Sequence, residues 1–173
     1  MTDINGAIAA FRDSLGSEHV SDDPASRERY ATATFPTPHT VPAVIRPGTR
    51  EEVQACLRIA NEFRVPVYPI STGLNTGYGS TVPAADGCVV MELKRLDRII
   101  EYNADLGYVT VEPGVTQEQL YAYLRERNAP YWLDVTGASP RHSMIGNIAE
   151  RGFGHTAYSD HFAHIGGMQV VLP

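Results

Sequence analysis

The sequence has few cysteines, no dense run of basic residues and no long apolar segment, and each absence excludes a class of protein. Two cysteines, Cys56 and Cys88, are too few for a disulfide scaffold or a metal cluster, so we expect both to be buried. A net charge of -6 without a basic stripe argues against nucleic acid as a partner. No stretch approaches the roughly eighteen consecutive apolar residues of a membrane helix, and residues 1–16 lack the pattern of a signal peptide. We therefore expect a cytoplasmic protein without a membrane span.

The first part of the chain alternates between helical and extended patterns. Apolar residues recur with helical spacing over residues 4–15, which predicts a helix. Residues 43–71 contain the apolar strand pattern "AVIRP", a helix that begins after Thr49, and the strand pattern "VPVYPIS", a length that suits a parallel βαβ unit. The polar, proline-containing residues 21–42 predict irregular chain with one short helical turn at most.

The remainder of the sequence is richer in extended patterns. These lie in "GCVVMELKRL", "RIIEYNADLGYVTVEPG" and "GMQVVLP", and one amphipathic helix begins after Thr116. We therefore predict an α+β fold, in which a small βαβ-type subdomain (residues 1–80) precedes a mostly antiparallel, β-rich subdomain (residues 81–173). The strongest boundary signal is the stretch with proline and glycine from Ser80 to Gly87.

The ten residues "STGLNTGYGS", 71–80, follow the second predicted strand, at the sheet edge where ligands bind in α/β proteins. Their glycines allow successive backbone N–H groups to converge on an anion. The glycine spacing fits neither a dinucleotide-binding helix turn nor a nucleoside triphosphate loop, and the stretch has no lysine for a terminal phosphate. Amides and hydroxyls without cations suit a buried pyrophosphate. Taken alone, the loop leaves open the alternative of an ordinary surface turn.

Two further glycine-bearing segments favour the binding site over the surface turn: "VEPGV" (111–115) and "SMIGNIAERGFGHTAYSDHF" (143–162). Together with "PISTGLNTGYGS", "LGYVTVEPGVTQEQLYAYL" and "WLDV", these segments resemble the FAD-binding domain of the vanillyl-alcohol oxidase and p-cresol methylhydroxylase flavoprotein family. The resemblance runs in order from about residue 28 to the end of the sequence. It implies that FAD is held between the two subdomains.

The resemblance also implies the residues of the site. One group would hold the pyrophosphate and lie beside the isoalloxazine, a second would run beside the flavin nucleotide, and a third would hold the ribityl and diphosphate groups. The expected cofactor-binding residues are Ser71, Thr72, Gly73, Leu74, Asn75, Thr76, Gly77, Tyr78, Gly79, Glu112, Pro113, Gly114, Ser143, Gly146, Asn147 and Glu150. Tyr78 is also the one expected catalytic residue, as a donor to the phenolate oxygen of the substrate. The alternative interpretation of Tyr78 is a half-buried aromatic side chain with a solvated hydroxyl and no catalytic role.

The implied reaction is hydride transfer from the benzylic carbon of a 4-substituted phenol to flavin N5, by way of a quinone methide. The sequence departs from the family pattern at two places. Where vanillyl-alcohol oxidase-like members have D-V-P-D, this sequence has Asp134-Val135-Thr136-Gly137, which lacks the second carboxylate and its acid–base assistance. Where a related branch links a histidine covalently to the flavin, this sequence has Asn75, so a covalent bond would need a residue outside this chain.

The family's FAD domain normally continues past the segment "GMQVVLP" and is followed by a cap domain that completes the substrate pocket. The sequence therefore predicts either a fragment of a longer flavoenzyme or a short relative without the cap domain. The implied partners are a phenolic substrate, a cap domain or second chain, a cytochrome or oxygen as electron acceptor, and further copies in a homo-oligomer. A non-catalytic FAD-binding or assembly module and an α+β domain that binds nothing remain as alternatives.

Three histidines lie close together near the end of the sequence: His155, His161 and His164. Without cysteines or a suitably spaced set of carboxylates they do not predict a metal site. We expect them near the flavin edge or in solvent. A hydrolase is not supported, because the G-x-S-x-G motif is absent.

Overall fold

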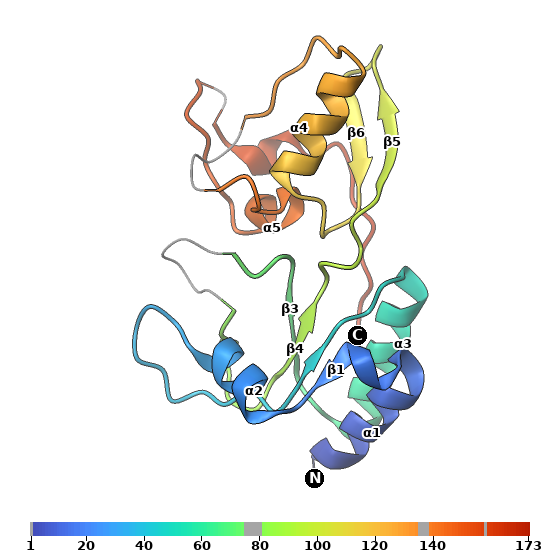
Figure 1. Cartoon of the computed structure of the whole chain (residues 1–173), viewed down its shortest axis with the longest axis vertical. Coiled ribbons are helices and arrows are strands. Elements are labelled where there is room, and N and C mark those ends of the chain that lie inside the picture. Colours follow the sequence, from blue (N-terminus) through green and yellow to red (C-terminus); the bar gives the residue numbers. More distant parts are fainter. Residues whose placement is uncertain (1, 75–80, 135–138, 158) are drawn as a thin grey trace. The chain divides into compact units, whose positions relative to one another are not determined.

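The computed structural model describes residues 2–74, 81–134, 139–157 and 159–173, which form two compact units (Figure 1). Unit 1 comprises Met1–Arg95 with Val170–Pro173, and unit 2 comprises Leu96–Gln169. The units divide after Arg95 and not in the expected stretch from Ser80 to Gly87. The reason is that strand β4 (Val89–Glu92) pairs within the sheet of unit 1.

Unit 1 is built on a four-stranded sheet in the order β1-β2-β4-β3. The strands β2 (Val44–Ile45) and β3 (Val67–Ile70) both run parallel to β4, which lies between them. The short β1 (Val20–Ser21) pairs antiparallel with β2. Helix α3 (Arg50–Phe63) connects β2 to β3, so the predicted βαβ unit is confirmed, with one strand inserted between its two strands.

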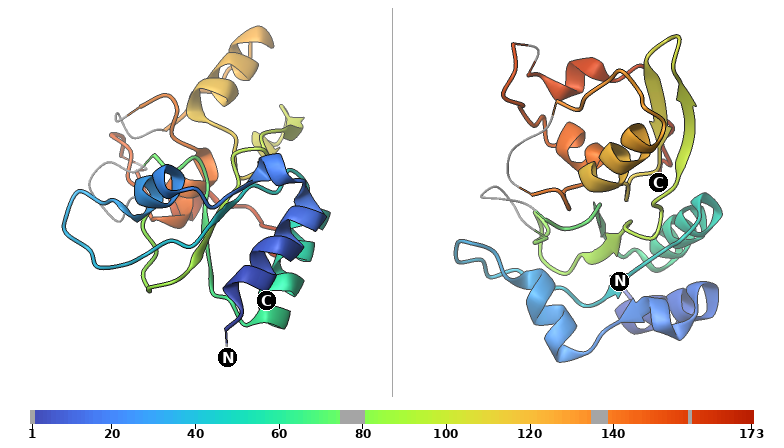
Figure 2. Two further views of the ribbon diagram at one scale, coloured as in Figure 1. Left: turned by 60° about the horizontal axis from the view of Figure 1, so that its bottom comes forward. Right: turned by 45° about the horizontal axis from the view of Figure 1, so that its top comes forward.

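One face of this sheet is covered by α1 (Ile4–Leu15) and α3, which lie side by side in Figures 1 and 2. Phe11 of α1 and Cys56 of α3 are fully buried in one apolar cluster with Val89 of β4. The helix begins after Thr49 as predicted, because the Thr49 hydroxyl accepts a hydrogen bond from the backbone N–H of Glu52. Burial of this apolar face supplies most of the stability of the two helices.

The opposite face of the sheet contacts α2 (Pro24–Ala31), a helix of eight residues. Tyr30 of α2 is buried with Val90, whose side chain points away from that of Val89 because successive strand residues alternate between faces. The expectation of one short helical turn in this segment is therefore wrong. Asp23 caps the helix by accepting from the N–H of Ser26, and proline is well suited to the first helical position.

Unit 2 is smaller and mixes a hairpin with short helices. Its elements are β5 (Ile99–Asn103), β6 (Tyr108–Val111), α4 (Gln117–Glu126), α5 (Met144–Ala149) and the 3-10 helix η2 (His161–His164). The hairpin is antiparallel, as predicted, and packs on α4 through a cluster that includes Val115, Leu120 and Leu124. In the described part of unit 2 these are the only two strands, and residues 167–173 form none. The α+β class is confirmed, although the second half contains less strand than predicted.

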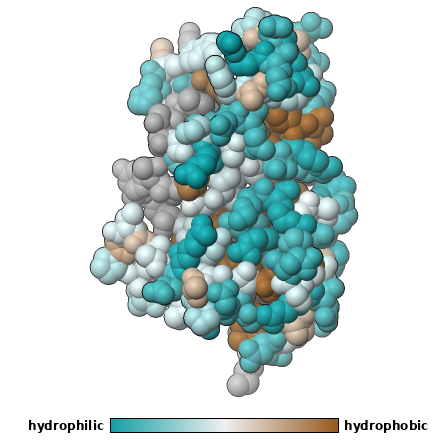
Figure 3. Space-filling model, in the orientation of Figure 1, coloured by the Kyte–Doolittle hydropathy of each residue, from teal (hydrophilic) through white to brown (hydrophobic). Residues whose placement is uncertain are grey.

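The surface of the chain is mainly hydrophilic on the face shown in Figure 3, where apolar residues are visible only in separate small areas. Among the described residues, no helix combines the length and the apolar character needed to cross a membrane. The apolar side chains gather instead in three clusters within the units.

Candidate functional site

The predicted pyrophosphate loop leaves the sheet of unit 1 at the carboxyl end of β3. Ser71–Leu74 are described, whereas Asn75, Thr76, Gly77, Tyr78 and Gly79 lie outside the described residues. Gly73 has a left-handed backbone with φ of 69°, and a Cβ atom there would lie 2.9 Å from Cγ2 of Thr81. The loop therefore needs glycine at this position for both backbone conformation and space.

Next to this loop, the carboxyl end of β4 carries a buried carboxylate that the sequence reasoning missed. Glu92 is 3% exposed and pairs in register with Ile70, the last residue of β3. Its oxygens accept from the Tyr30 hydroxyl at 2.8 Å and from Nε of Arg46 at 2.8 Å, and Nζ of Lys94 lies 2.8 Å away. The sequence signal for this buried carboxylate was the charged residue at the end of the apolar run "CVVME".

These contacts set the charge of Glu92. Burial disfavours its ionised form, but the hydrogen bonds from Lys94, Tyr30 and Arg46 outweigh burial and lower the pKa of Glu92 below its usual value. Burial and the same carboxylate raise the pKa of Tyr30. The carboxylate of Glu92 lies between two cations, Arg46 and Lys94, so the three side chains together carry a net positive charge. They lie at the end of the sheet from which the loop after β3 leaves.

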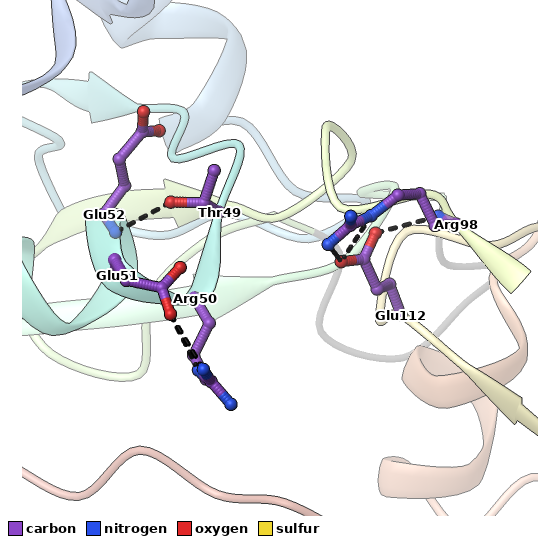
Figure 4. A network of polar contacts seen from close by, with 6 residues as sticks. All are labelled: Thr49, Arg50, Glu51, Glu52, Arg98 and Glu112. Carbon is purple, nitrogen blue, oxygen red and sulfur yellow. Dashed lines mark hydrogen bonds and ion pairs between the residues drawn. The ribbon is translucent and has the colours of Figure 1, made fainter. Parts of the chain in front are cut away.

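In unit 2, the side chain of Glu112, which was expected beside the cofactor, forms hydrogen bonds with another residue of the same chain. Its carboxylate accepts from the backbone N–H of Arg98 at 2.8 Å and from Nε and Nη2 of the same residue at 3.1 and 2.6 Å (Figure 4). These bonds from Arg98 lower the pKa of Glu112. Glu112 thus joins the end of β6 to the start of β5 and fixes the turn at Pro113 and Gly114, whose N–H donates to the Leu96 carbonyl.

The start of α5 lies against that turn, so the structure brings two of the predicted segments together. The Met144 N–H donates to the Val115 carbonyl at 2.9 Å, and Thr116 and Ser143 form an isolated antiparallel bridge. Ser143 caps α5, since its hydroxyl accepts from the N–H of Gly146 at 2.9 Å. The Glu150 side chain, at the other end of α5, is exposed.

Asn147 of α5 belongs to a group of polar side chains that extends to η2. Its Oδ1 lies 2.5 Å from Nδ1 of His161, a residue that is 5% exposed. On the far side of the ring, Nε2 of His161 lies 3.6 Å from Oδ2 of Asp134, which also accepts from the Thr156 hydroxyl at 2.9 Å. His161 is thus buried between an amide and a carboxylate, and of its two expected positions, beside the flavin or in solvent, the second is wrong.

The other two histidines, His155 and His164, are exposed. Among the residues that the structure describes, no group of three or more histidine, cysteine, aspartate or glutamate side chains is arranged to hold a metal ion. Cys56 and Cys88 are both buried and unpaired, as predicted, and burial raises the pKa of the Cys56 thiol to about 12.

The described residues of unit 2 fit a ligand that is rich in acceptor oxygens. Glu112, the buried acid of the predicted set, has its charge balanced by Arg98. The side chain of Asn147 is partly exposed, and its amide nitrogen has no partner among the described residues. Dinucleotide cofactors present such oxygens on their phosphates, ribityl chain and ring carbonyls.

Comparison with known proteins identifies the ligand class. A family model described as "FAD binding domain" matches residues 41–173. The chain is 52% identical over 170 residues to 1'-carboxy-chondrochloren decarboxylase of Chondromyces crocatus, covering 98% of this chain and 31% of that protein. It is 37% identical over 173 residues to the 4-cresol dehydrogenase [hydroxylating] flavoprotein subunit of Pseudomonas putida, with 98% and 33% covered.

Among solved structures, the chain is similar to p-cresol methylhydroxylase with substrate bound, with a TM-score of 0.87 and 36% identity. This match covers 92% of the chain and 32% of that structure's chain, so the chain spans about a third of the length of the relatives it matches. The cofactor is FAD, which the resemblance had implied. The chain belongs to the FAD binding domain family, and its domain is of the p-cresol methylhydroxylase type.

Proposed function

We propose that the chain is the FAD-binding part of an oxidoreductase that acts on 4-substituted phenols. The observation that supports this most strongly is its similarity to the 4-cresol dehydrogenase subunit and to p-cresol methylhydroxylase, over 98% and 92% of the chain. In the proposed reaction the phenol is bound as its phenolate, after its hydroxyl proton has passed to solvent, and loss of a hydride from the benzylic carbon gives the neutral quinone methide. FAD, when bound, supplies the acceptor for that hydride at N5 of its ring.

Each group of residues in the chain has a distinct role in this proposal. The loop that begins at Ser71 and the turn and helix of unit 2 would bind and orient the cofactor through amides and hydroxyls. Tyr78 would donate to the phenolate oxygen and so favour the charged form of the substrate from which the hydride leaves. Asp134 contacts Thr156 and His161, and the second carboxylate of the family pattern is absent, since Gly137 stands at its place.

The partners follow from the same proposal. A cap domain or a second chain would complete the substrate pocket, and the assembly would be a homo-oligomer. Electrons would pass from the reduced cofactor to oxygen or to a cytochrome.

One observation supports a second candidate reaction, a decarboxylation. The relative with 52% identity is named a decarboxylase, so the same domain type serves a protein that removes a carboxyl group. In that case the substrate would carry a carboxylate, and carbon dioxide would be released during turnover. Assays of matched 4-alkylphenols with and without a carboxyl group on the side chain separate the two reactions.

The first experiment is a titration of the purified chain with FAD, followed by the visible absorption and the quenching of flavin fluorescence. Saturable binding with one FAD per chain is expected. Absence of binding at high FAD concentration would contradict the proposal that this chain binds the cofactor by itself.

The second experiment tests the reaction on the FAD-loaded chain with 4-alkylphenols. Turnover supports the oxidoreductase, whereas FAD binding without turnover supports the non-catalytic binding or assembly module. If turnover is found, Tyr78→Phe should lower kcat/KM for phenols by much more than it weakens FAD binding, because the change removes only the hydroxyl. Tyr121→Phe is the matched control, because Tyr121 is an exposed tyrosine on α4.

A further inference from the structure

We propose that His161 is a positioning residue for FAD, which holds the Asn147 side chain so that it can only donate, never accept, a hydrogen bond toward the cofactor. This inference rests on the proposed binding of FAD beside α5. Its ligand is an acceptor oxygen of the cofactor's ribityl or diphosphate part. Three features of unit 2 support it: the contacts of the His161 ring, the confinement of Asn147, and the group behind the ring.

The contacts of the His161 ring decide the orientation of the amide. Oδ1 of Asn147 faces Nδ1 of His161, an arrangement in which Nδ1 carries a proton and donates it. That hydrogen bond uses the acceptor atom of the amide. The remaining polar atom, Nδ2 of Asn147, has two hydrogens and no partner among the described residues, and the residue is partly exposed. A ligand at Asn147 therefore meets a donor.

Asn147 is confined from a second side by Gly152. The Gly152 N–H donates to the Asn147 carbonyl at 2.8 Å, and any Cβ atom on Gly152 would overlap the Asn147 amide group. The backbone of His161 in turn donates to the Gly152 carbonyl at 3.3 Å. The amide is thus held between a ring and a backbone, which restricts its rotation.

A carboxylate lies behind the His161 ring, close to Nε2 but not hydrogen-bonded to it among the described residues. Oδ2 of Asp134 lies 3.6 Å from Nε2 and is itself held by the Thr156 hydroxyl. Gly154 has no space for a side chain, because a Cβ atom there would overlap the Asp134 carboxylate. A carboxylate, an imidazole and an amide therefore follow one another in a row, in which the imidazole contacts the amide directly and only its ring is buried.

Four variants of the chain, with FAD titration and thermal unfolding, test the proposal. His161→Phe keeps a ring but removes the donor, and Asn147→Asp keeps the bond to His161 but replaces the outward donor by an acceptor. Each should weaken FAD binding by roughly tenfold to a hundredfold, the usual effect of losing one such bond. His161→Asn restores a donor at the position of Nδ1 and should bind FAD within about threefold of the original chain. His164→Asn, an exposed histidine of the same short helix, is the control and should have no effect.

A measurement without FAD tests the geometry directly. Nitrogen-detected NMR of the histidine rings reports which nitrogen carries the proton, and Nδ1 of His161 should be protonated. If Nδ1 is unprotonated, the amide of Asn147 faces the other way and the proposal is overturned.

The outcomes separate this inference from the proposed function. If the original chain binds FAD and Asn147→Asp binds it equally well, the positioning role fails while the FAD site stands. If the original chain does not bind FAD, both fail. Should His161→Phe unfold, the comparison of Asn147→Asp with His161→Asn still decides, because both keep a polar contact between the two residues.

Discussion

Replacement of Glu92 by glutamine tests whether the stability of unit 1 depends on the buried charge at the carboxyl end of β4. The side chain keeps its shape, but it loses the negative charge that faces Tyr30, Arg46 and Lys94, and one of its two acceptor oxygens becomes an NH2 group. Each such contact weakens by about 1 kcal/mol, and the lower cost of burying an amide returns part of that loss. We expect a net loss of about 2 kcal/mol in the free energy of unfolding at neutral pH, measured by urea denaturation.

The same variant should change how stability depends on pH. Because the pKa of Glu92 is lower in the folded chain than its usual value, its contribution is present above the unfolded pKa and is lost as the pH falls through the folded pKa. Glu92→Gln should therefore be most destabilised near neutral pH, and the difference from the original chain should shrink in acid. A constant difference across this range would refute the reasoning.

The ion pair of Arg50 and Glu51, visible in Figure 4, provides the control for that experiment. Its side chains are 54% and 67% exposed, so water screens their attraction. Glu51→Gln should change the free energy of unfolding by less than about 0.5 kcal/mol at any pH. A loss from Glu51→Gln as large as that from Glu92→Gln would mean that burial is not the source of the effect.

Three further substitutions have effects that follow from single contacts. Gly73→Ala should cost about 1–2 kcal/mol and weaken FAD binding, because its φ of 69° disfavours a side chain and Thr81 blocks the space; thermal unfolding and FAD titration check this. Phe11→Ala should cost about 3–5 kcal/mol in urea denaturation, since this ring is fully buried between α1, α3 and the sheet. Thr116→Ala should cost about 1 kcal/mol, because it removes the hydroxyl that accepts from the Gln119 N–H and donates to Gln119 Oε1 at the start of α4; circular dichroism during thermal unfolding measures it.

The starts of the helices could be predicted from the sequence because the signals are local. Thr49 and Thr116 both cap helices by accepting from a backbone N–H three residues later, and both helices carry apolar residues on one face. The helix α2 carries a comparable cap at Asp23 but buries only Tyr30, so its apolar pattern was too weak to recognise. The capping signal at Asp23 was therefore present in the sequence, but the spacing of apolar residues did not indicate a helix there.

The position of β4 could not be derived locally. Its residues Val89–Glu92 are all buried, which fits a central parallel strand, but its partners β2 and β3 lie far away in the sequence. Assigning it to the second half moved the expected boundary toward the N-terminus. The contacts of Glu92 and Glu112 were unpredictable for the same reason, because Tyr30, Arg46 and Arg98 come near them only through strand register and helix packing.

The glycines of the candidate site illustrate how one residue type can serve two physical needs. Gly73 has a left-handed backbone, the property that glycine-rich anion loops require. Gly152 and Gly154 do not, and what excludes a side chain there is the close approach of Asn147 and Asp134. In the sequence these three positions are all simply glycines, so a motif does not distinguish the two needs. The difference matters for function, since the first shapes a backbone that could surround phosphate oxygens, whereas the other two make room for the row of side chains that orients a single donor.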